Sequence, residues 1–486
     1  MICACVGAET AEQALADMAE ARRQGADLCE LRADYLKDLK DPDLPRILSA
    51  KPLPVLVTVR PKWEGGRFEG SEADRIGLLE DACLHGADYV DVEFRAYKDF
   101  RRRQAGLVLS YHDFEKTPDD VERTASKMAE LEPLVVKIAC RARGAADLVR
   151  LARLQKQAAR PTAVVAMGDF GEPLRILYRK YGGFLTYASV RGGAETAPGQ
   201  VTVEELVRLY QGKTVDDETE AYGVIGDPVA HSRGPLLFND VFKQLGMNAR
   251  YVRIRVDDAG TLRDLVSALE LRGVSVTIPH KQAVMAALDG ADEIAKGIGA
   301  ANTVVARDGR LEGHNTDVLA AVEALKDAAV RKWSHGIYGM RALVLGAGGV
   351  SRAIAWGLKR EAARVTIANR TFERGKALAE ELGVECARWH DLLSARPQIV
   401  VNGTSVGMAP KADESPADAS LFTKDMVAMD TVYTPRETRF LKDAAARGAL
   451  AVDGVEMFLR QANHQFRLWT GRSIPTEIYK EWQRKL

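Results

Sequence analysis

An alternation of short apolar runs and helix-like segments fills the first half of the chain and constrains its fold more than any other feature. The candidate strands are MICACVG, ADLCELRA, PVLVTVR, ADYVDVEF, GLVLSYHDF, PLVVKIAC, TAVVAMGD and FLTYASV. The segments between them, such as AADLVRLARLQKQAA, carry apolar residues at three- and four-residue spacing, which is typical of amphipathic helices. Eight strands alternating with helices predict a closed (β/α)8 barrel, with an open doubly wound sheet as the alternative.

The second half begins again after a polar stretch, QGKTVDDETEA, which predicts a linker. It opens with AYGVIGDPVAHS and later carries a strand, a glycine-rich turn and a helix in RALVLGAGGVSRAIAWGL. This order predicts a separate α/β protein with a dinucleotide-binding lobe of the Rossmann type.

The length of the chain predicts more than one domain, and its charge argues against some kinds of partner. A chain of 486 residues is too long for one ordinary core. Its 68 Lys and Arg residues balance 68 Asp and Glu residues, which argues against nucleic acid or an anionic membrane as the main partner. Neither a signal peptide nor a membrane-spanning run is expected, and the oligomeric state stays open.

The six cysteines form no CxxC pair, so we expect reduced thiols in a cytoplasmic protein and no metal site.

Polar residues gather at the ends of the predicted barrel strands, on the side that faces the interior. They are Glu30, Arg32, Thr58, Arg60, Asp91, Glu93, Ser110, His112 and Lys137. A desolvated lysine near other cations has a lowered pKa, so the amine of Lys137 is predicted to attack a carbonyl and form a Schiff base. His112 is the expected general acid–base, and Arg32, Arg60 and Arg175 are expected to hold an anionic substrate.

The motifs ELRAD, TVRPKWEGG, SYHDF, VVKIA, AMGDFGEPLR and TAPGQ resemble, in order, those of type I 3-dehydroquinate dehydratase. The resemblance implies that Lys137 forms a Schiff base with 3-dehydroquinate, that His112 moves the protons and that Glu64 orients His112. It assigns the substrate's hydroxyls and carboxylate to Glu30, Arg32, Arg60, Arg175, Thr196 and Gln200, with Thr196 where the family often has serine. A class I aldolase, the competing Schiff-base barrel, would not explain His112 together with Arg175 and PGQ.

The glycine-rich turn in LVLGAGGVSRA lets backbone amides and a helix N-terminus approach a pyrophosphate. The residues concerned are Gly346, Ala347, Gly348, Gly349 and Val350. The next strand ends in Asn369, Arg370 and Thr371, where an NAD enzyme carries an acid for the ribose hydroxyl. Because Arg370 and Arg374 can pair with a 2′-phosphate, the cofactor is predicted to be NADP.

VAHSRGP, VSVTIPHK, GAANTV, GHNTD, VNGTSVGM, MDTVYTP and GVEMFLRQA resemble shikimate dehydrogenase from about residue 220 onward. The resemblance implies a catalytic pair, Lys281 and Asp317. It implies substrate contacts from Ser232, Gly234, Thr277, Asn302, Tyr433 and Gln461, and a nicotinamide end lined by Thr404, Val432, Gly454 and Met457. The domains expected from both resemblances are a barrel at 1–213, a linker at 214–220, a substrate lobe at 221–317 and 456–486, and an NADP lobe at 318–455.

Together the resemblances imply a bifunctional shikimate-pathway enzyme that dehydrates 3-dehydroquinate and reduces the resulting 3-dehydroshikimate with NADPH. Gly234 replaces a family serine and is expected to leave space beside C1 of the substrate. Shikimate is therefore expected to be preferred with quinate accepted, and a quinate-preferring second domain is the alternative. A non-catalytic ligand sensor is the rival from another class, and the presence of Lys137, His112, Lys281 and Asp317 argues against it.

Overall fold

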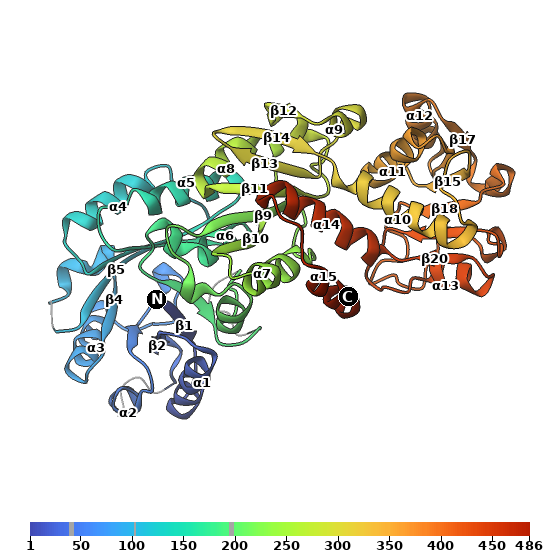
Figure 1. Cartoon of the computed structure of the whole chain (residues 1–486). Helices are drawn as coiled ribbons and strands as arrows, with labels where there is room; N and C mark the ends of the chain where they lie inside the picture. Colours follow the sequence, from blue (N-terminus) through green and yellow to red (C-terminus); the bar gives the residue numbers. More distant parts are fainter. Residues whose placement is uncertain (38–42, 102–103, 194–198) are drawn as a thin grey trace. The chain divides into compact units, whose positions relative to one another are not determined.

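The computed structural model describes residues 1–37, 43–101, 104–193 and 199–486. The chain divides into two compact units, Met1–Arg272 and Gly273–Leu486. Figure 1 shows the elements of each unit along the chain.

Eight parallel strands form the barrel of the first unit. They are β1 (Ile2–Val6), β2 (Leu28–Arg32), β3 (Val55–Thr58), β4 (Tyr89–Glu93), β5 (Gly106–Asp113), β6 (Val135–Arg141), β7 (Thr162–Met167) and β8 (Thr186–Ser189). Their order is β7-β6-β5-β4-β3-β2-β1-β8, and the amide of Phe184 donates to the Thr162 carbonyl at 2.9 Å between the two end strands. The predicted barrel is confirmed, and the open doubly wound sheet is wrong.

Helices follow the strands and lie outside the barrel (Figure 1). They are α1 (Ala11–Gln24), α2 (Asp43–Ala50), α3 (Glu72–Leu84), α4 (Val121–Glu130), α5 (Ala145–Lys156) and α6 (Glu172–Ile176). Local signals set their ends. In α1 the Thr10 hydroxyl accepts from the amide of Gln13, and Gly25, with φ of 101°, ends the helix in the left-handed conformation.

Four further elements complete the first unit: β9 (Glu220–Gly226), α7 (Gly234–Gln244), β10 (Ala249–Arg255) and α8 (Leu262–Leu269). β9 and β10 pair in parallel. The stretch predicted as a linker is tied to this unit, because the Thr219 hydroxyl bonds to both Asp216 and Asn248 at 2.9 Å. The compact unit therefore extends beyond the expected barrel boundary.

The second unit contains a mixed sheet and a parallel sheet. In the first, β11 (Leu271–Val276) pairs antiparallel with β13 (Thr303–Arg307), which pairs with β14 (Arg310–His314), and β14 pairs with β12 (Gly290–Ala291). The helices with these strands are α9 (Glu293–Ile298), α10 (Thr316–Trp333), α14 (Gly454–Thr470) and α15 (Thr476–Lys485).

The parallel sheet has the order β17-β16-β15-β18-β19-β20. Its strands are β15 (Arg341–Leu345), β16 (Arg364–Ala368), β17 (Glu385–Ala387), β18 (Ile399–Asn402), β19 (Val427–Asp430) and β20 (Leu450–Val452), with helices α11 (Gly349–Arg360), α12 (Phe372–Leu382) and α13 (Arg439–Ala446). The strand order reverses at β15, and sheets of this kind bind dinucleotides at the carboxyl ends of the strands beside such a reversal, here β15 and β18. The predicted Rossmann lobe is confirmed.

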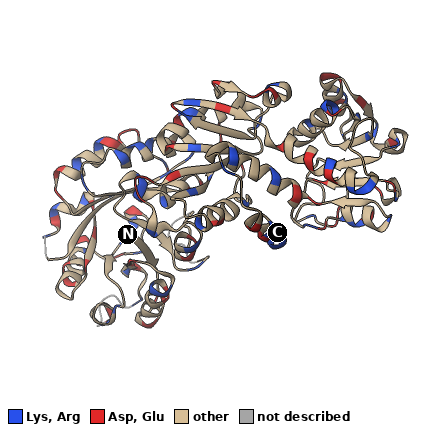
Figure 2. Cartoon of the chain, viewed as in Figure 1, with Lys and Arg blue, Asp and Glu red and all other residues tan. Residues whose placement is uncertain are grey.

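Basic and acidic residues are interspersed along the chain of both units (Figure 2). Among the helices of the described residues, none is both long and apolar enough to cross a membrane. The six cysteines carry free thiols, and all but Cys386 are buried.

Candidate active sites

Lys137 lies on β6 inside the barrel, between two carboxylates. Its Nζ is 2.9 Å from Asp91 Oδ2 and 3.1 Å from Glu30 Oε1, and it lies 4.2 Å from the centre of the Tyr187 ring. The side chain of Lys137 is buried. A cation placed between two acids over an aromatic face is strongly stabilised.

The charge on Lys137 corrects one expectation. Burial lowers the pKa of this lysine, but the carboxylates of Asp91 and Glu30 outweigh burial and raise the pKa above its ordinary value. Burial raises the pKa of Asp91 in turn, but the cations of Arg60 and Lys137 overcome it and lower that pKa strongly. The predicted neutral amine is wrong for the free protein, because sequence spacing did not reveal that both acids point at the lysine.

His112 lies on β5, on the same side as Lys137. Lys137 is the register partner of Ser110, so His112 is one side-chain step further toward the carboxyl end of the strands. Glu64 Oε1 lies 3.0 Å from His112 Nδ1 and accepts from the His112 amide at 2.8 Å. Burial, with the cations of Arg60 and Lys137, lowers the pKa of His112 well below its ordinary value. The imidazole is therefore neutral and able to take a proton.

The pKa of Glu64 also depends on the groups around it. Burial raises the pKa of Glu64 to about 8, despite the opposing charge of Arg60. The hydrogen bond between this carboxyl and the imidazole fixes the orientation of the ring.

The predicted arginines make different contacts. Arg60 reaches Asp91 at 2.9 Å, Glu93 at 2.6 Å and the Ser110 hydroxyl at 2.9 Å. Arg32 is held by Asp34 through two bonds of 2.9 and 2.8 Å. Arg60 is therefore part of the lysine's charge network, whereas Arg32 is fixed in a separate pair.

Arg175 lies on α6, buried, with its guanidinium 3.4 Å from the Gly168 carbonyl. Burial lowers the pKa of Arg175 to about 10, so it stays charged. Gln200 donates to the Cys5 sulfur at 3.4 Å. Thr196 lies outside the described residues.

In the second unit, Lys281 and Asp317 form the predicted pair. Lys281 Nζ lies 2.6 Å from Asp317 Oδ2. Asp317 is in the first turn of α10, whose N-terminus is capped by the Asn315 side chain. The aspartate therefore has a fixed position beside an amine that can give or take a proton.

Asn302 holds the beginning of the same helix. Its amide oxygen accepts from the backbone amide of Thr316 at 2.8 Å, and its amide nitrogen donates to the Thr316 hydroxyl at 3.0 Å. Thr277 follows β11 and is half-buried, and Tyr433 stacks on Phe458 with ring centres 5.1 Å apart. Gln461 is half-buried on α14, one turn before Gln465, which binds the Ser275 hydroxyl at 2.8 Å.

The glycine-rich turn leaves β15 and enters α11, as predicted. Gly346 has φ of +109°, and a Cβ there would lie 2.7 Å from the Ser351 hydroxyl, so glycine is required. At Gly348 a Cβ would meet open space. The loop thus combines tight packing with an accessible helix N-terminus, which fits a bound pyrophosphate. Ala347 and Val350 are half-buried beside it.

Arg370, Thr371 and Arg374, which follow β16, are exposed, and Asn369 is half-buried. Asn369 stabilises the turn by donating to the Thr371 carbonyl at 2.8 Å. Two exposed guanidinium groups at this position fit a 2′-phosphate.

The residues predicted at the nicotinamide end follow β18 and β19. Asn402 accepts from Thr404, donates to Asp430 at 2.9 Å and so ties the two strand ends together. Val432 and Met457 are buried, and a Cβ on Gly454 would lie 2.3 Å from the Val432 carbonyl. Glycine at 454 therefore permits the close approach of α14 to the end of β19.

Gly234 contradicts the expectation of open space. Its amide lies 3.3 Å from the Ser232 hydroxyl, and a Cβ there would lie 2.8 Å from Cε1 and 3.1 Å from the hydroxyl of Tyr251. The Tyr251 ring fills the space that the missing serine would leave. Sequence reasoning missed this because Tyr251 is on β10, 17 positions along the chain.

Four family models match successive parts of the chain. They are type I 3-dehydroquinase at residues 2–217, the shikimate dehydrogenase substrate binding domain at 224–304, shikimate / quinate 5-dehydrogenase at 328–406 and the shikimate 5′-dehydrogenase C-terminal domain at 454–480. The chloroplastic bifunctional 3-dehydroquinate dehydratase/shikimate dehydrogenase of Arabidopsis thaliana is 38% identical over 99% of this chain and 84% of its own.

The chain belongs to the bifunctional 3-dehydroquinate dehydratase/shikimate dehydrogenase family. Its dehydrogenase part is also 42% identical to the NADP(+)-dependent shikimate dehydrogenase of Thermococcus kodakarensis, over 53% of this chain and 93% of that one. A solved shikimate dehydrogenase in complex with NADP+ matches 56% of this chain and 96% of its own, with a TM-score of 0.52 and 34% identity. A quinate dehydrogenase from Corynebacterium glutamicum in complex with NAD matches 55% and 99%, with a TM-score of 0.51 and 31% identity.

Several residues of the dehydratase barrel were missed as site residues or given no role. Asp91, Glu93, Ser110 and Thr58 were recognised as polar strand ends only, yet they bind Lys137, Arg60 and Glu30. Tyr187, whose ring centre lies 4.2 Å from Lys137 Nζ, pairs in register with Cys3 on β1, and this pairing is visible only in the structure. Asp34 carried no signal in the sequence either.

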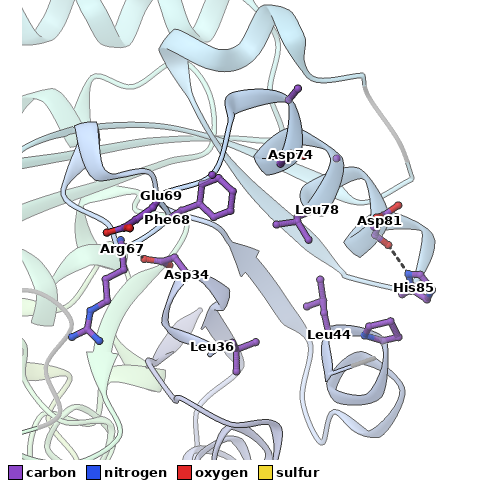
Figure 3. A pocket seen from close by; sticks show the side chains of 14 residues that line it. Asp34, Leu36, Leu44, Arg67, Phe68, Glu69, Asp74, Leu78, Asp81 and His85 are labelled. Atoms are coloured by element: carbon purple, nitrogen blue, oxygen red, sulfur yellow. Dashed lines mark hydrogen bonds between the residues drawn. The ribbon is translucent and has the colours of Figure 1, made fainter. Parts of the chain in front are cut away.

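The barrel also has a hollow on its outside, between α2 and α3 (Figure 3). It measures about 980 Å³, and Leu36, Leu44 and Leu78 lie around it. The His85 ring is bonded at its rim to the Asp81 carbonyl at 2.8 Å. Lys137, His112 and Glu64 do not line this hollow, whereas Asp34, which holds Arg32, does.

Proposed function

We propose that the barrel dehydrates 3-dehydroquinate through a Schiff base on Lys137, with His112 as the acid–base group. The observation that carries this proposal is the position of Lys137 between Asp91 and Glu30, one side-chain step from His112. Glu30, Arg32, Arg60, Arg175, Thr196 and Gln200 are proposed to bind the substrate's hydroxyls and carboxylate.

The chemistry follows from these charges. The ammonium of Lys137 gives up one proton, the resulting amine adds to the C3 carbonyl, and that proton leaves with the carbonyl oxygen as water, which gives a cationic iminium. Because the iminium keeps the charge of the ammonium, Asp91 and Glu30 stabilise it in the same place. His112 removes the C2 proton to leave an enamine, then protonates the C1 hydroxyl, which departs as water. Hydrolysis of the iminium consumes one water and releases 3-dehydroshikimate, so the net change is loss of one water.

For the second half, we propose reduction of 3-dehydroshikimate to shikimate. Bound NADPH supplies the hydride. Lys281 is proposed to give the proton to the C3 oxygen, with Asp317 holding its amine in place. Ser232, Gly234, Thr277, Asn302, Tyr433 and Gln461 are proposed to surround the substrate. Because Tyr251 fills the space beside Gly234, the structural argument for accepting quinate falls away.

Cofactor binding is assigned to three groups of residues. The turn Gly346–Val350 is proposed to hold the pyrophosphate, and Asn369, Arg370, Thr371 and Arg374 the ribose 2′-phosphate. Thr404, Val432, Gly454 and Met457 are proposed to line the nicotinamide end. The accessible N-terminus of α11 and the exposed arginines support this assignment.

The functional division is proposed to follow the expected domains, 1–213, 214–220, 221–317 with 456–486, and 318–455. The matched ranges of the family models support it in outline. We propose a reducing compartment, the cytoplasm, which the free and mostly buried thiols support.

Borohydride trapping tests the barrel mechanism. Reduction in the presence of 3-dehydroquinate should leave a stable adduct on Lys137, located by peptide mass spectrometry, and Lys137→Ala should abolish both adduct and dehydration. Lys281→Ala is the matched control, because it removes a half-buried lysine of the second unit and should leave the adduct unchanged. An adduct on another lysine, or none with active protein, contradicts the proposal.

A further inference from the structure

Strand β10 belongs to the range that matches the shikimate dehydrogenase substrate binding domain, yet its polar face contacts the barrel within the first unit. Arg253 and Arg255 alternate along β10, so their side chains point to one side, and Asp257 lies two residues beyond the end of the strand. Each of the three touches a segment that follows the carboxyl end of β6 or β7, where a barrel places its catalytic loops.

Arg253 holds the helix that carries Arg175. Its guanidinium lies 3.4 Å from Glu172 of α6 and 3.1 Å from the Tyr210 hydroxyl, which itself donates to Glu172 at 3.0 Å. Glu172 opens this five-residue helix, and Arg175 lies one turn later. The short helix is therefore anchored at its first residue by the dehydrogenase strand.

Arg255 holds the turn before that helix. It bonds to Asp169 at 3.1 Å, and its guanidinium lies 4.9 Å from the centre of the Phe170 ring. The adjacent Gly168 carbonyl accepts from Arg175, and a Cβ on Gly199 would lie only 2.6 Å from it. The turn thus touches Arg175 and the residue next to Gln200, two proposed substrate contacts.

Asp257 completes the set at helix α5, which follows the strand of Lys137. Its carboxylate accepts from the amide of Ala145 at 2.9 Å, in the first turn of a helix whose own N-cap residue, Gly144, offers no side-chain bond. A Cβ at residue 144 would lie 2.6 Å from Asp257 Oδ2, so the glycine makes room for this cap.

We propose that strand β10 of the dehydrogenase, with the residues that directly follow it, is a structural part of the dehydratase site. Arg253 and Arg255 are positioning residues for the loops that hold Arg175 and Gln200, and Asp257 is the cap of helix α5, which follows the strand of Lys137. This inference rests on the proposed role of Arg175 in binding 3-dehydroquinate. It predicts that a change in the dehydrogenase strand alters substrate binding in the barrel.

The test uses the full chain with Arg253→Met, which keeps much of the side chain's length and removes its charge. The KM for 3-dehydroquinate should rise about three- to tenfold, with a smaller change in kcat and an unchanged dehydrogenase kcat/KM. Arg253→Lys should recover part of the loss. Arg310→Met, an exposed arginine on β14, is the control and should change neither activity.

A double-mutant cycle separates positioning from general stability. If Arg253 acts through Arg175, Arg253→Met should have little further effect in an Arg175→Met background, because the two residues act as one unit. Equal losses of both activities with a lowered Tm, or full additivity in the cycle, overturn the inference. If Lys137→Ala keeps its dehydratase activity, the proposed function itself fails, which is a separate outcome.

Asp257 provides the second variant pair. Asp257→Ala removes the acceptor for Ala145 and should raise the dehydratase KM, whereas Asp257→Asn keeps an acceptor oxygen and should remain close to wild type. Identical behaviour of the two variants contradicts a capping role.

Discussion

Two lysines carry the proposed chemistry, and their surroundings differ. The side chain of Lys137 is 5% exposed and is held by two carboxylates over a tyrosine ring, whereas that of Lys281 is 15% exposed and is held by Asp317. The first environment stabilises a cation that stays in place when the ammonium becomes an iminium. The second suits an amine that exchanges a proton with substrate and solvent. The number and burial of the partners, rather than the residue type, decide which chemistry a lysine performs.

The largest expected effect comes from replacing each of the two lysines in turn, because each variant should lose one activity and keep the other. Lys137→Met should abolish dehydration and leave reduction of supplied 3-dehydroshikimate intact, whereas Lys281→Met should lower reduction by about 10²–10⁴-fold and leave dehydration intact. Both are measured on one preparation, following enone absorbance for the first reaction and NADPH oxidation for the second. A variant that loses both activities without loss of folding would break the comparison.

The pH dependence of the barrel should reflect its neutral histidine. Burial and the cations of Arg60 and Lys137 lower the pKa of His112, so the base stays unprotonated as pH falls through 6.5. We expect kcat/KM for dehydration to decline only well below that pH. An acid limb at or above pH 6.5 would show that His112 is not desolvated as described.

Removing the partner of His112 sharpens the same point. Glu64→Gln keeps a hydrogen-bonding group but removes the carboxyl that can accept or give a proton, and should lower the dehydratase kcat about 10²-fold. Glu69→Gln, which alters an exposed acid paired with Lys62, is the control. NADPH-dependent reduction should be unchanged in both variants.

Cofactor choice gives a smaller effect in the second unit. Arg370→Met removes a charge-assisted contact of about 1.5–3 kcal/mol, so the KM for NADPH should rise about ten- to hundredfold while that for NADH changes little. Arg364→Met, at the opposite end of β16, is the matched control. A wild-type protein that uses both cofactors equally well would contradict the assignment.

The smallest effect concerns Gly234. Gly234→Ser should lower the free energy of unfolding by about 1–3 kcal/mol, because the new side chain meets the Tyr251 ring. The measurement is urea unfolding, with Gly290→Ser, whose Cβ meets open space, as control. Equal stability of the two variants would show that Tyr251 moves aside and that the space is available.

Local patterns were sufficient to predict the barrel and the Rossmann lobe. Each strand of the first half needs only a short apolar run, and its helix needs only a cap such as Thr10 and a stop such as Gly25. The glycine turn at Gly346 is likewise local, because its positive φ and its contact with Ser351 arise within one strand–turn–helix segment. Lys137, His112, Lys281 and Asp317 were found because their motifs are short and ordered.

Contacts between distant segments could be known only from the tertiary structure. The raised pKa of Lys137 depends on Glu30, 107 positions away, and on Asp91, 46 positions away, and spacing along a strand does not say which acid reaches which base. The filling of Gly234 by Tyr251 and the anchoring of Glu172 by Arg253 have the same origin. The sequence by itself determined the helices, the strands and the reactive groups, because each depends on a pattern of only a few neighbouring residues. Charge states, the space in each site and the part that β10 takes in the barrel were decided by folding, because electrostatics and packing act through distance in space.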